Sequence, residues 1–221
     1  LVENCINAVK SSKYQKGSVV DLRSIPQGAQ IVLVGDLHAN IGNFIRILTH
    51  KNAEGRSILD NLAKGSVFLV FLGDALHKEI SLKDARFDFV TQKDGDRNYT
   101  DFNKFVEHLY TDMHDSVLLM HMIMALKVRF PDNVHYLLGN HDVFGYDCYK
   151  QPLKELINQS ECFRQFLHRE FSSAYVRSYL RFLRISPVVL LGKGIVGVHG
   201  GPSKYPVSLK YLMRHEASDL N

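Results

Sequence analysis

The chain alternates short apolar runs with longer segments of mixed polarity. Each run is almost continuously apolar and rich in β-branched or aromatic residues, which is typical of strands that are covered on both faces. The predicted strands are Ile31–Val34, Val67–Leu72, Val134–Leu138 and Ile195–Val198, with Val188–Leu191 as a hairpin partner of the last.

The intervening segments place apolar residues three or four positions apart, which is the spacing of a helix with one buried face. They are Ile41–His50, Phe102–Phe130 and Leu153–Phe182. The methionines of the middle segment are expected in the core, because flexible thioethers fill irregular gaps. Strands that alternate with helices predict an α/β fold, and a length of 221 residues suits a single domain over residues 1–221.

A polar signature follows each of the four main strands. In open α/β sheets, ligands collect beyond the carboxyl ends of the strands, and a neighbouring glycine lets the backbone come close to a ligand. Four such ends in one chain predict a single site. The signatures are Gly35-Asp36-Leu37-His38, Gly73-Asp74, Gly139-Asn140-His141-Asp142 and His199-Gly200-Gly201.

The side chains in these signatures suit metal ions. Carboxylate, amide and imidazole groups are ligands for hard or borderline cations, and the set contains no thiolate. Asp36 and His38 alternate along one extended segment, so both can hold one ion. Asp74 has two carboxylate oxygens and can bridge two ions, while Asn140 and His199 offer an oxygen and a nitrogen to the second.

Two ions about 3.5–4 Å apart would hold an activated hydroxide for direct, in-line attack on phosphorus. His141 directly follows a proposed ligand and is the candidate general acid for the leaving oxygen, a role typically worth about 10²–10⁴-fold in rate. No covalent enzyme intermediate is expected, because no cysteine belongs to the motifs.

Each motif has a commonplace explanation when it is taken alone. Gly73-Asp74 can be an ordinary turn, Asn140 can cap a helix, and His199 can be an exposed loop residue. Their occurrence together, after four strands, favours the metal site. A row of arginines between residues 164 and 184 is expected to face solvent, with a phosphate clamp as the alternative.

The amino-acid composition limits the binding partners and the cellular compartment that can be expected. The net charge of +4 is too small to indicate a nucleic-acid partner, and no apolar run approaches the ~20 residues of a membrane span. Three cysteines without a CxxC pair favour a reducing compartment, either the cytoplasm or a host cytosol into which the protein is delivered. The chain begins with Leu1 rather than Met, and we expect it to be incomplete at one or both ends.

In this order, GDLH, GD, GNHD and VHGGP resemble the motifs of calcineurin-like metallophosphoesterases, and VHGGP resembles the phosphoprotein phosphatase branch. The resemblance extends from Val32 to Ser203. It implies a four-layer αββα fold with a central β-sandwich, and two divalent metal ions, most commonly manganese, with iron or zinc as alternatives. It also implies first-ion ligands at Asp36 and His38, a bridge at Asp74, second-ion ligands at Asn140 and His199, and a proton donor at His141.

Several positions depart from the family pattern. Ala39 replaces a usual glycine, and Ala75-Leu76-His77-Lys78-Glu79 replaces a segment that ends in Asp-Arg-Gly. Lys78 is therefore the candidate substrate-binding residue together with Asn140, although it lacks the two-pronged geometry of arginine. His77 cannot act as the anion that orients the catalytic histidine, so Asp142 is the candidate for that catalytic role.

Two longer-range departures remain. The stretch between Asp74 and Asn140 is expanded, which we interpret as a helical insertion around residues 80–130 that can select substrates or dock a protein partner. The family also has a metal-binding histidine further downstream, for which His215 is the one histidine left after His199. Its sequence context favours a helix surface instead.

The expected function is that of a metal-dependent phosphomonoesterase, specifically a protein phosphatase. Phosphorylated proteins or small phosphoesters are the expected substrates. The alternatives are a dinucleoside polyphosphate or other small-molecule phosphatase, and a scaffold that keeps the fold without turnover. The changes at His77 and Lys78 favour the scaffold, and the five intact ligand positions speak against it.

Overall fold

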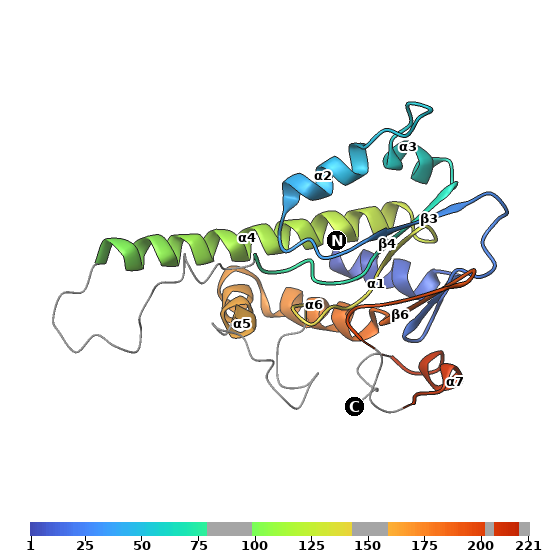
Figure 1. The fold of residues 1–221 in the computed structure, drawn as a ribbon. Coiled ribbons are helices and arrows are strands. Elements are labelled where there is room, and N and C mark those ends of the chain that lie inside the picture. Colours follow the sequence, from blue (N-terminus) through green and yellow to red (C-terminus); the bar gives the residue numbers. More distant parts are fainter. Residues whose placement is uncertain (79–98, 143–158, 202–205, 217–221) are drawn as a thin grey trace.

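A computed structural model describes residues 1–78, 99–142, 159–201 and 206–216 of the chain, with the backbone alone at 99–106, 108 and 159–161. Its order of elements is mixed α/β, as predicted, with two separate sheets and a long helix across the middle of the molecule (Figure 1). The expected insertion starts among residues 79–98, which lie outside the described ranges.

One sheet has three parallel strands in the order β3 (Gln30–Val34), β4 (Val67–Phe71) and β5 (Val134–Tyr136). The other has four strands in the order β1 (Gln15–Lys16), β2 (Val19–Asp21), β6 (Val189–Gly192) and β7 (Ile195–Val198). Strands β2 and β6 are parallel, whereas β6 and β7 pair antiparallel as the predicted hairpin.

The central strand β4 shows how the sheets stack. All five of its residues are buried, and successive side chains of a strand point to opposite faces. Val67, Leu69 and Phe71 belong to a core shared with the helices. Phe68 and Val70 belong to a second core, which they share with Leu190 of the four-stranded sheet. The two sheets therefore form the expected β-sandwich, with a helical layer on the outer face of the three-stranded sheet.

Five helices lie in or beside that helical layer. Capping side chains stabilise the N-terminal ends of three of them. The side chain of Asn40 accepts a hydrogen bond from the backbone of Asn43, and Ser57 and Asp60 form a capping box. Ser172 accepts a hydrogen bond from the backbone of Tyr175. The helices are α1 (Val2–Ser11), α2 (Ile41–Thr49), α3 (Ile58–Ala63), α5 (Gln159–Glu170) and α6 (Ser173–Ile185).

Helix α4 (Tyr99–Arg129) is the longest element and packs on α1 and α2. Its second half belongs to the core, where Met113, Met120 and Met124 are buried as expected. No helix within the described ranges combines the length and the apolarity needed to cross a bilayer.

Three details differ from the sequence prediction. The helical pattern up to Phe182 is divided between α5 and α6, because the cap at Ser172 starts a new helix. Strand β3 is not covered on both faces: it lies at one side of the three-stranded sheet, and Leu33 is 44% exposed. The short strands β1 and β2 and the helix α1 lie outside the predicted elements.

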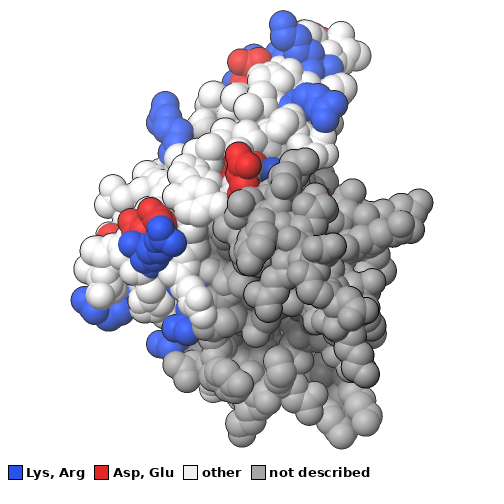
Figure 2. Space-filling view, turned by 90° about the vertical axis from the view of Figure 1, so that its left-hand side faces the viewer, with Lys and Arg blue, Asp and Glu red and all other residues white. Residues whose placement is uncertain are grey.

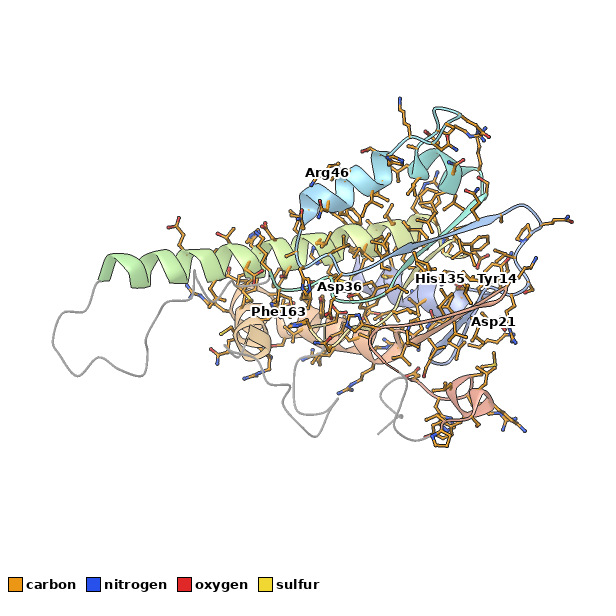
Figure 3. The ribbon with its side chains drawn as sticks, viewed as in Figure 1. Tyr14, Asp21, Asp36, Arg46, His135 and Phe163 are labelled. Carbon is orange, nitrogen blue, oxygen red and sulfur yellow. The ribbon has the colours of Figure 1, made fainter. Side chains whose placement is uncertain are left out.

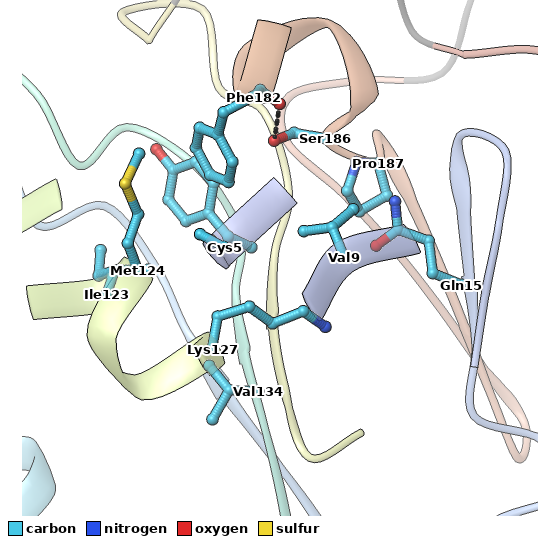
Figure 4. A pocket seen from close by; sticks show the side chains of 11 residues that line it. Cys5, Val9, Gln15, Ile123, Met124, Lys127, Val134, Phe182, Ser186 and Pro187 are labelled. Atoms are coloured by element: carbon cyan, nitrogen blue, oxygen red, sulfur yellow. Dashed lines mark hydrogen bonds between the residues drawn. The ribbon is translucent and has the colours of Figure 1, made fainter. Parts of the chain in front are cut away.

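A charged side chain is buried among these helices. Lys127 is 4% exposed, and its ammonium donates to the carbonyl oxygen of Pro131 at 2.6 Å. Beside it lies a cavity of about 10 Å³, room for about one water molecule, with Cys5, Val9 and Phe182 among its lining (Figure 4). Burial lowers the pKa of Lys127 from 10.5 to about 8, so the charged form costs stability at neutral pH.

We expect Lys127→Met to stabilise the fold at pH 7 by up to roughly 3 kcal/mol, since each pKa unit corresponds to about 1.4 kcal/mol. Between about pH 8 and 10.5 the unfolded lysine keeps its proton and the folded lysine loses it. Raising the pH therefore stabilises the unaltered chain relative to the variant. Urea unfolding at pH 7 and pH 9.5 measures the difference, with the exposed Lys193→Met as control. Identical pH dependences for both lysine variants would contradict the assignment.

Candidate metal centre

The loops that follow β3 and β4 are joined through their backbones. The N–H groups of Leu37 and His38 both donate to the carbonyl oxygen of Asp74, each at 3.0 Å. The N–H of Ala39 donates to the carbonyl oxygen of Ala75 at 2.8 Å. These bonds continue the pairing of the two strands past their ends, so the two polar signatures come together without help from their side chains.

The Asp142 carboxylate ties the loop after β5 to the loop after β4. It accepts hydrogen bonds from the N–H groups of Asp74 at 2.9 Å, Gly139 at 2.7 Å and Ala75 at 3.0 Å. Asp142 is completely buried, and this burial raises the pKa of its carboxyl group. Within the described residues, Nδ1 of His141 is buried and has no hydrogen-bond partner. The contacts of Asp142 are thus with the backbone and with the Tyr136 side chain, and its predicted role in orienting His141 stays a prediction.

All four residues other than glycine that have a positive φ among the described residues lie in these loops. They are His38 at 45°, Ala39 at 54°, Asp74 at 50° and His77 at 60°. Residues other than glycine rarely adopt a positive φ, and each instance costs of order 1–3 kcal/mol of conformational energy. Such residues cluster at functional sites. The value at Ala39 gives a physical reason for the glycine that the motif usually has there.

The first group of donor atoms comes from the loops after β3 and β4. One donor atom from each of Asp36, His38 and Asp74 lies within 4.8 Å of the others. Nδ1 of His38 lies 2.9 Å from the carbonyl oxygen of His77. Because a carbonyl only accepts, Nδ1 carries the proton and Nε2 is left with a lone pair for a metal ion. Figure 3 shows Asp36 near the centre of the molecule, far from Tyr14 and Asp21.

The second group forms around His199, which follows β7. Its Nε2 atom lies 2.8 Å from Oδ1 of Asn140 and 3.2 Å from Oδ2 of Asp74. Its Nδ1 atom lies 3.0 Å from the carbonyl oxygen of Leu72, which again directs Nε2 toward the other donors. The structure therefore brings together all five sequence-predicted ligands, in two groups that share Asp74.

These donors fit two divalent ions. Oxygen and imidazole ligands suit manganese, iron or zinc. Asp74 is only 3% exposed, and a buried carboxylate is costly unless cations or hydrogen bonds compensate its charge. Asp74 belongs to both donor groups, which is the placement that the predicted bridge requires. Asp36, Asn140 and the ring of His199 remain open to solvent in part, which leaves a side from which a substrate can approach.

His141 lies beside the donors rather than among them. Its backbone N–H donates to Oδ1 of Asp74 at 2.8 Å, and its ring centroid lies 5.5 Å from that of His38. The residue is partly exposed, while Nδ1 of its ring is buried. This position, next to the ligands and with a free side chain, is compatible with the proton donor that the sequence predicts.

Lys78 and His215 have contacts that the sequence did not indicate. Nζ of Lys78 lies 2.5 Å from Oδ2 of Asp115 on α4, so its charge is shared with a carboxylate. His215 follows α7 (Leu209–Leu212), where its Nδ1 lies 2.8 Å from the carbonyl oxygen of Tyr211. The two rings stack at 4.0 Å. His215 thus lies in a bend beyond the end of α7, rather than on a helix surface as the sequence context favoured, and it is not part of the donor groups.

The site also requires closely packed backbones. A Cβ atom on Gly139 would overlap Oδ1 and the backbone nitrogen of Asp74. We therefore expect Gly139→Ala to displace the Asp74 carboxylate and to weaken metal binding by at least roughly tenfold, because changes to groups that support a ligand cost about 10–100-fold. Gly35→Ala is the matched control, since its Cβ would meet no atom within 4 Å. Calorimetric titration with Mn²⁺ measures both variants. Equal Mn²⁺ affinities of the two variants would show that the structure accommodates the added Cβ atom without displacing the carboxylate.

A β-sandwich with acidic and imidazole donors at the ends of its strands is the arrangement that the resemblance to calcineurin-like metallophosphoesterases implies. The model of the calcineurin-like phosphoesterase family matches residues 29–220, so the chain belongs to that family. This finding confirms the resemblance drawn from the four motifs. Comparison with curated protein sequences finds no match.

The fold is shared with a solved phosphatase structure. It is a protein serine/threonine phosphatase from Saccharomyces cerevisiae with similarity to human phosphatase PP5. The TM-score is 0.52 and the sequence identity 15%, over 96% of this chain and 51% of that one. The chain therefore spans about half the length of that phosphatase. At this identity, the likeness supports the fold and leaves the substrate open.

Proposed function

We propose that the chain is a metal-dependent phosphomonoesterase that acts on phosphorylated proteins. The observation that supports it most is the pair of donor groups that share Asp74, with His141 beside them. A mononuclear site would not need a carboxylate placed between two sets of ligands. We propose manganese as the metal at this site.

Divalent ions bound here would supply positive charge for the phosphoryl oxygens and would lower the pKa of a coordinated water. The chain's own residues fix where this happens. The donor atoms of Asp36 and His38 gather with Asp74, and those of Asn140 and His199 form the second group. These four residues would therefore set the position of the phosphate. The bond from the backbone of His141 to Asp74 keeps the imidazole next to that position. The proposed proton transfer runs from this imidazole to the leaving oxygen.

The choice of a phosphorylated protein as substrate rests on three considerations. VHGGP resembles the phosphoprotein phosphatase branch, and the solved structure with the same fold is described as a protein serine/threonine phosphatase. The donor groups are half-open to solvent rather than enclosed, because the side chain of Asp36 is 50% exposed. On the face shown in Figure 2, Lys and Arg side chains are scattered over the described surface and form no continuous basic patch there.

Phosphate release with added Mn²⁺ tests the proposal. Peptides containing phosphoserine, phosphothreonine or phosphotyrosine are compared with a dinucleoside polyphosphate at equal concentration. We expect metal-dependent release from at least one class of phosphopeptide and a lower kcat/KM for the nucleotide. The reverse preference would support a small-molecule phosphatase, and Mn²⁺ binding without release from any substrate would support a scaffold. The cytoplasmic location and the docking role of the predicted insertion remain proposals.

A further inference from the structure

Two polar side chains of α4 are buried directly behind the metal centre. Asp112 is 1% exposed and Ser116 is fully buried, although their neighbours Met113 and Val117 belong to the apolar core. Residues four positions apart lie on one face of a helix, so the aspartate and the serine point in the same direction. Neither of them belongs to the motifs or to the donor groups.

Both side chains bind the backbone of the same turn. Oγ of Ser116 accepts a hydrogen bond from the N–H of His77 at 3.0 Å. Oδ1 of Asp112 accepts one from the N–H of the next residue, Lys78, at 2.7 Å. His77 has a φ of 60°, which a residue with a side chain keeps only when its surroundings enforce it. The two bonds from α4 provide that enforcement.

The turn that α4 holds is the one that orients a metal ligand. The carbonyl oxygen of His77 is the partner of Nδ1 of His38, at 2.9 Å. Such a partner fixes both the tautomer and the direction of a metal-binding imidazole. The chain of contacts therefore runs from α4 through the backbone at residues 77 and 78 to Nε2 of His38.

The side chain of His77 takes no part in this chain of contacts. Neither of its ring nitrogens has a hydrogen-bond partner among the described residues. Its Nδ1 lies 3.6 Å from Oδ2 of Asp112, which is too long for a hydrogen bond. Its ring packs edge-on against Phe163 at 5.3 Å. Residue 77 thus acts through its backbone, and its imidazole fills space.

We propose that Asp112 and Ser116 are positioning residues for the first metal ion. They hold the backbone of His77 in its left-handed conformation, so that its carbonyl fixes the orientation of His38. This inference rests on the proposed metal site. It assigns a role in ion binding to a helix whose residues are remote from all four motifs in the sequence.

The test compares Mn²⁺ affinity in two backgrounds by calorimetric titration. The His199→Ala background retains the ligands of the first ion, and the His38→Ala background retains those of the second. Asp112→Ala should weaken binding roughly 10- to 100-fold in the first background and should leave the second unchanged. Asp112→Asn keeps an oxygen that can accept from Lys78, and it should restore most of the affinity. Ser116→Ala serves as a second variant that removes only one oxygen atom.

A general loss of structure would affect both backgrounds equally, and that result would overturn the inference. Nitrogen-15 NMR of the metal-free chain gives a readout that is independent of the ion. His38 should be protonated at Nδ1 in the unaltered chain and should become a mixture of tautomers in Asp112→Ala or Ser116→Ala. An unchanged tautomer would also overturn the inference. Binding of Mn²⁺ without phosphate release contradicts the proposed function alone, because the positioning effect is measured without catalysis.

Discussion

Asp74→Asn should abolish metal-dependent hydrolysis of p-nitrophenyl phosphate. Asp74 is the one residue shared by the two donor groups, with one oxygen near His199 and a ligand atom grouped with those of Asp36 and His38. An asparagine offers one oxygen without charge, so it cannot bridge two cations. Charge stabilisation by such ions is worth several kcal/mol, and the rate should therefore fall by at least roughly 10²–10³-fold. The Mn²⁺ stoichiometry should also decrease.

The control for this variant is Asp21→Asn. Asp21 is the last residue of β2, and its carboxylate pairs with Arg23 at 2.8 Å. It lies away from the metal centre (Figure 3). This change should leave both turnover and metal stoichiometry as they are. If Asp74→Asn retained Mn²⁺-dependent turnover close to that of the control, the two donor groups would not be the catalytic centre.

His141→Asn should impair proton transfer to the leaving group and should leave the binding of metal ions largely unchanged. His141 contacts the centre through its backbone N–H, which bonds to Asp74 and remains in the variant. Metal affinity should therefore change little. Turnover of an alkyl phosphate such as a phosphoserine peptide should fall by roughly 10²–10⁴-fold, since its leaving oxygen needs a proton in the transition state.

The comparison with p-nitrophenyl phosphate makes this prediction specific. The p-nitrophenolate group leaves without protonation, so the same variant should retain much more of its rate on this substrate. An equal loss on both substrates would argue against a general acid at this position. A loss of bound Mn²⁺ would show that the imidazole of His141 is a ligand instead.

The donor residues could be predicted because each of them lies within four positions of a strand end. Local patterns identify β4 and the residues that follow it, and the carboxyl ends of parallel strands necessarily meet. That rule does not account for the location of His199, because β7 belongs to the second sheet and runs antiparallel to β6. Its side chain reaches the same place only because the sheets are stacked.

The supporting contacts could not be predicted in the same way. Asp112 and Ser116 are separated from the turn that they hold by more than 30 positions, and nothing in the helical pattern of α4 indicates a polar task for them. Lys78 carries the charge expected of a phosphate-binding residue, yet its bond to Asp115 follows from how α4 packs. Contacts of this kind depend on tertiary packing, for which a single sequence carries no local signal.

Asp74 binds the surrounding loops through its backbone N–H and carbonyl groups as well as through its carboxylate. Its N–H binds Asp142, its carbonyl oxygen binds the amides of Leu37 and His38, and its side chain binds the amide of His141. Grafting this centre onto another scaffold would therefore require these three chain segments to be transplanted together, with their backbones in register, along with the loop that carries His199. Copying the ligand side chains alone would reproduce the motif and lose the geometry.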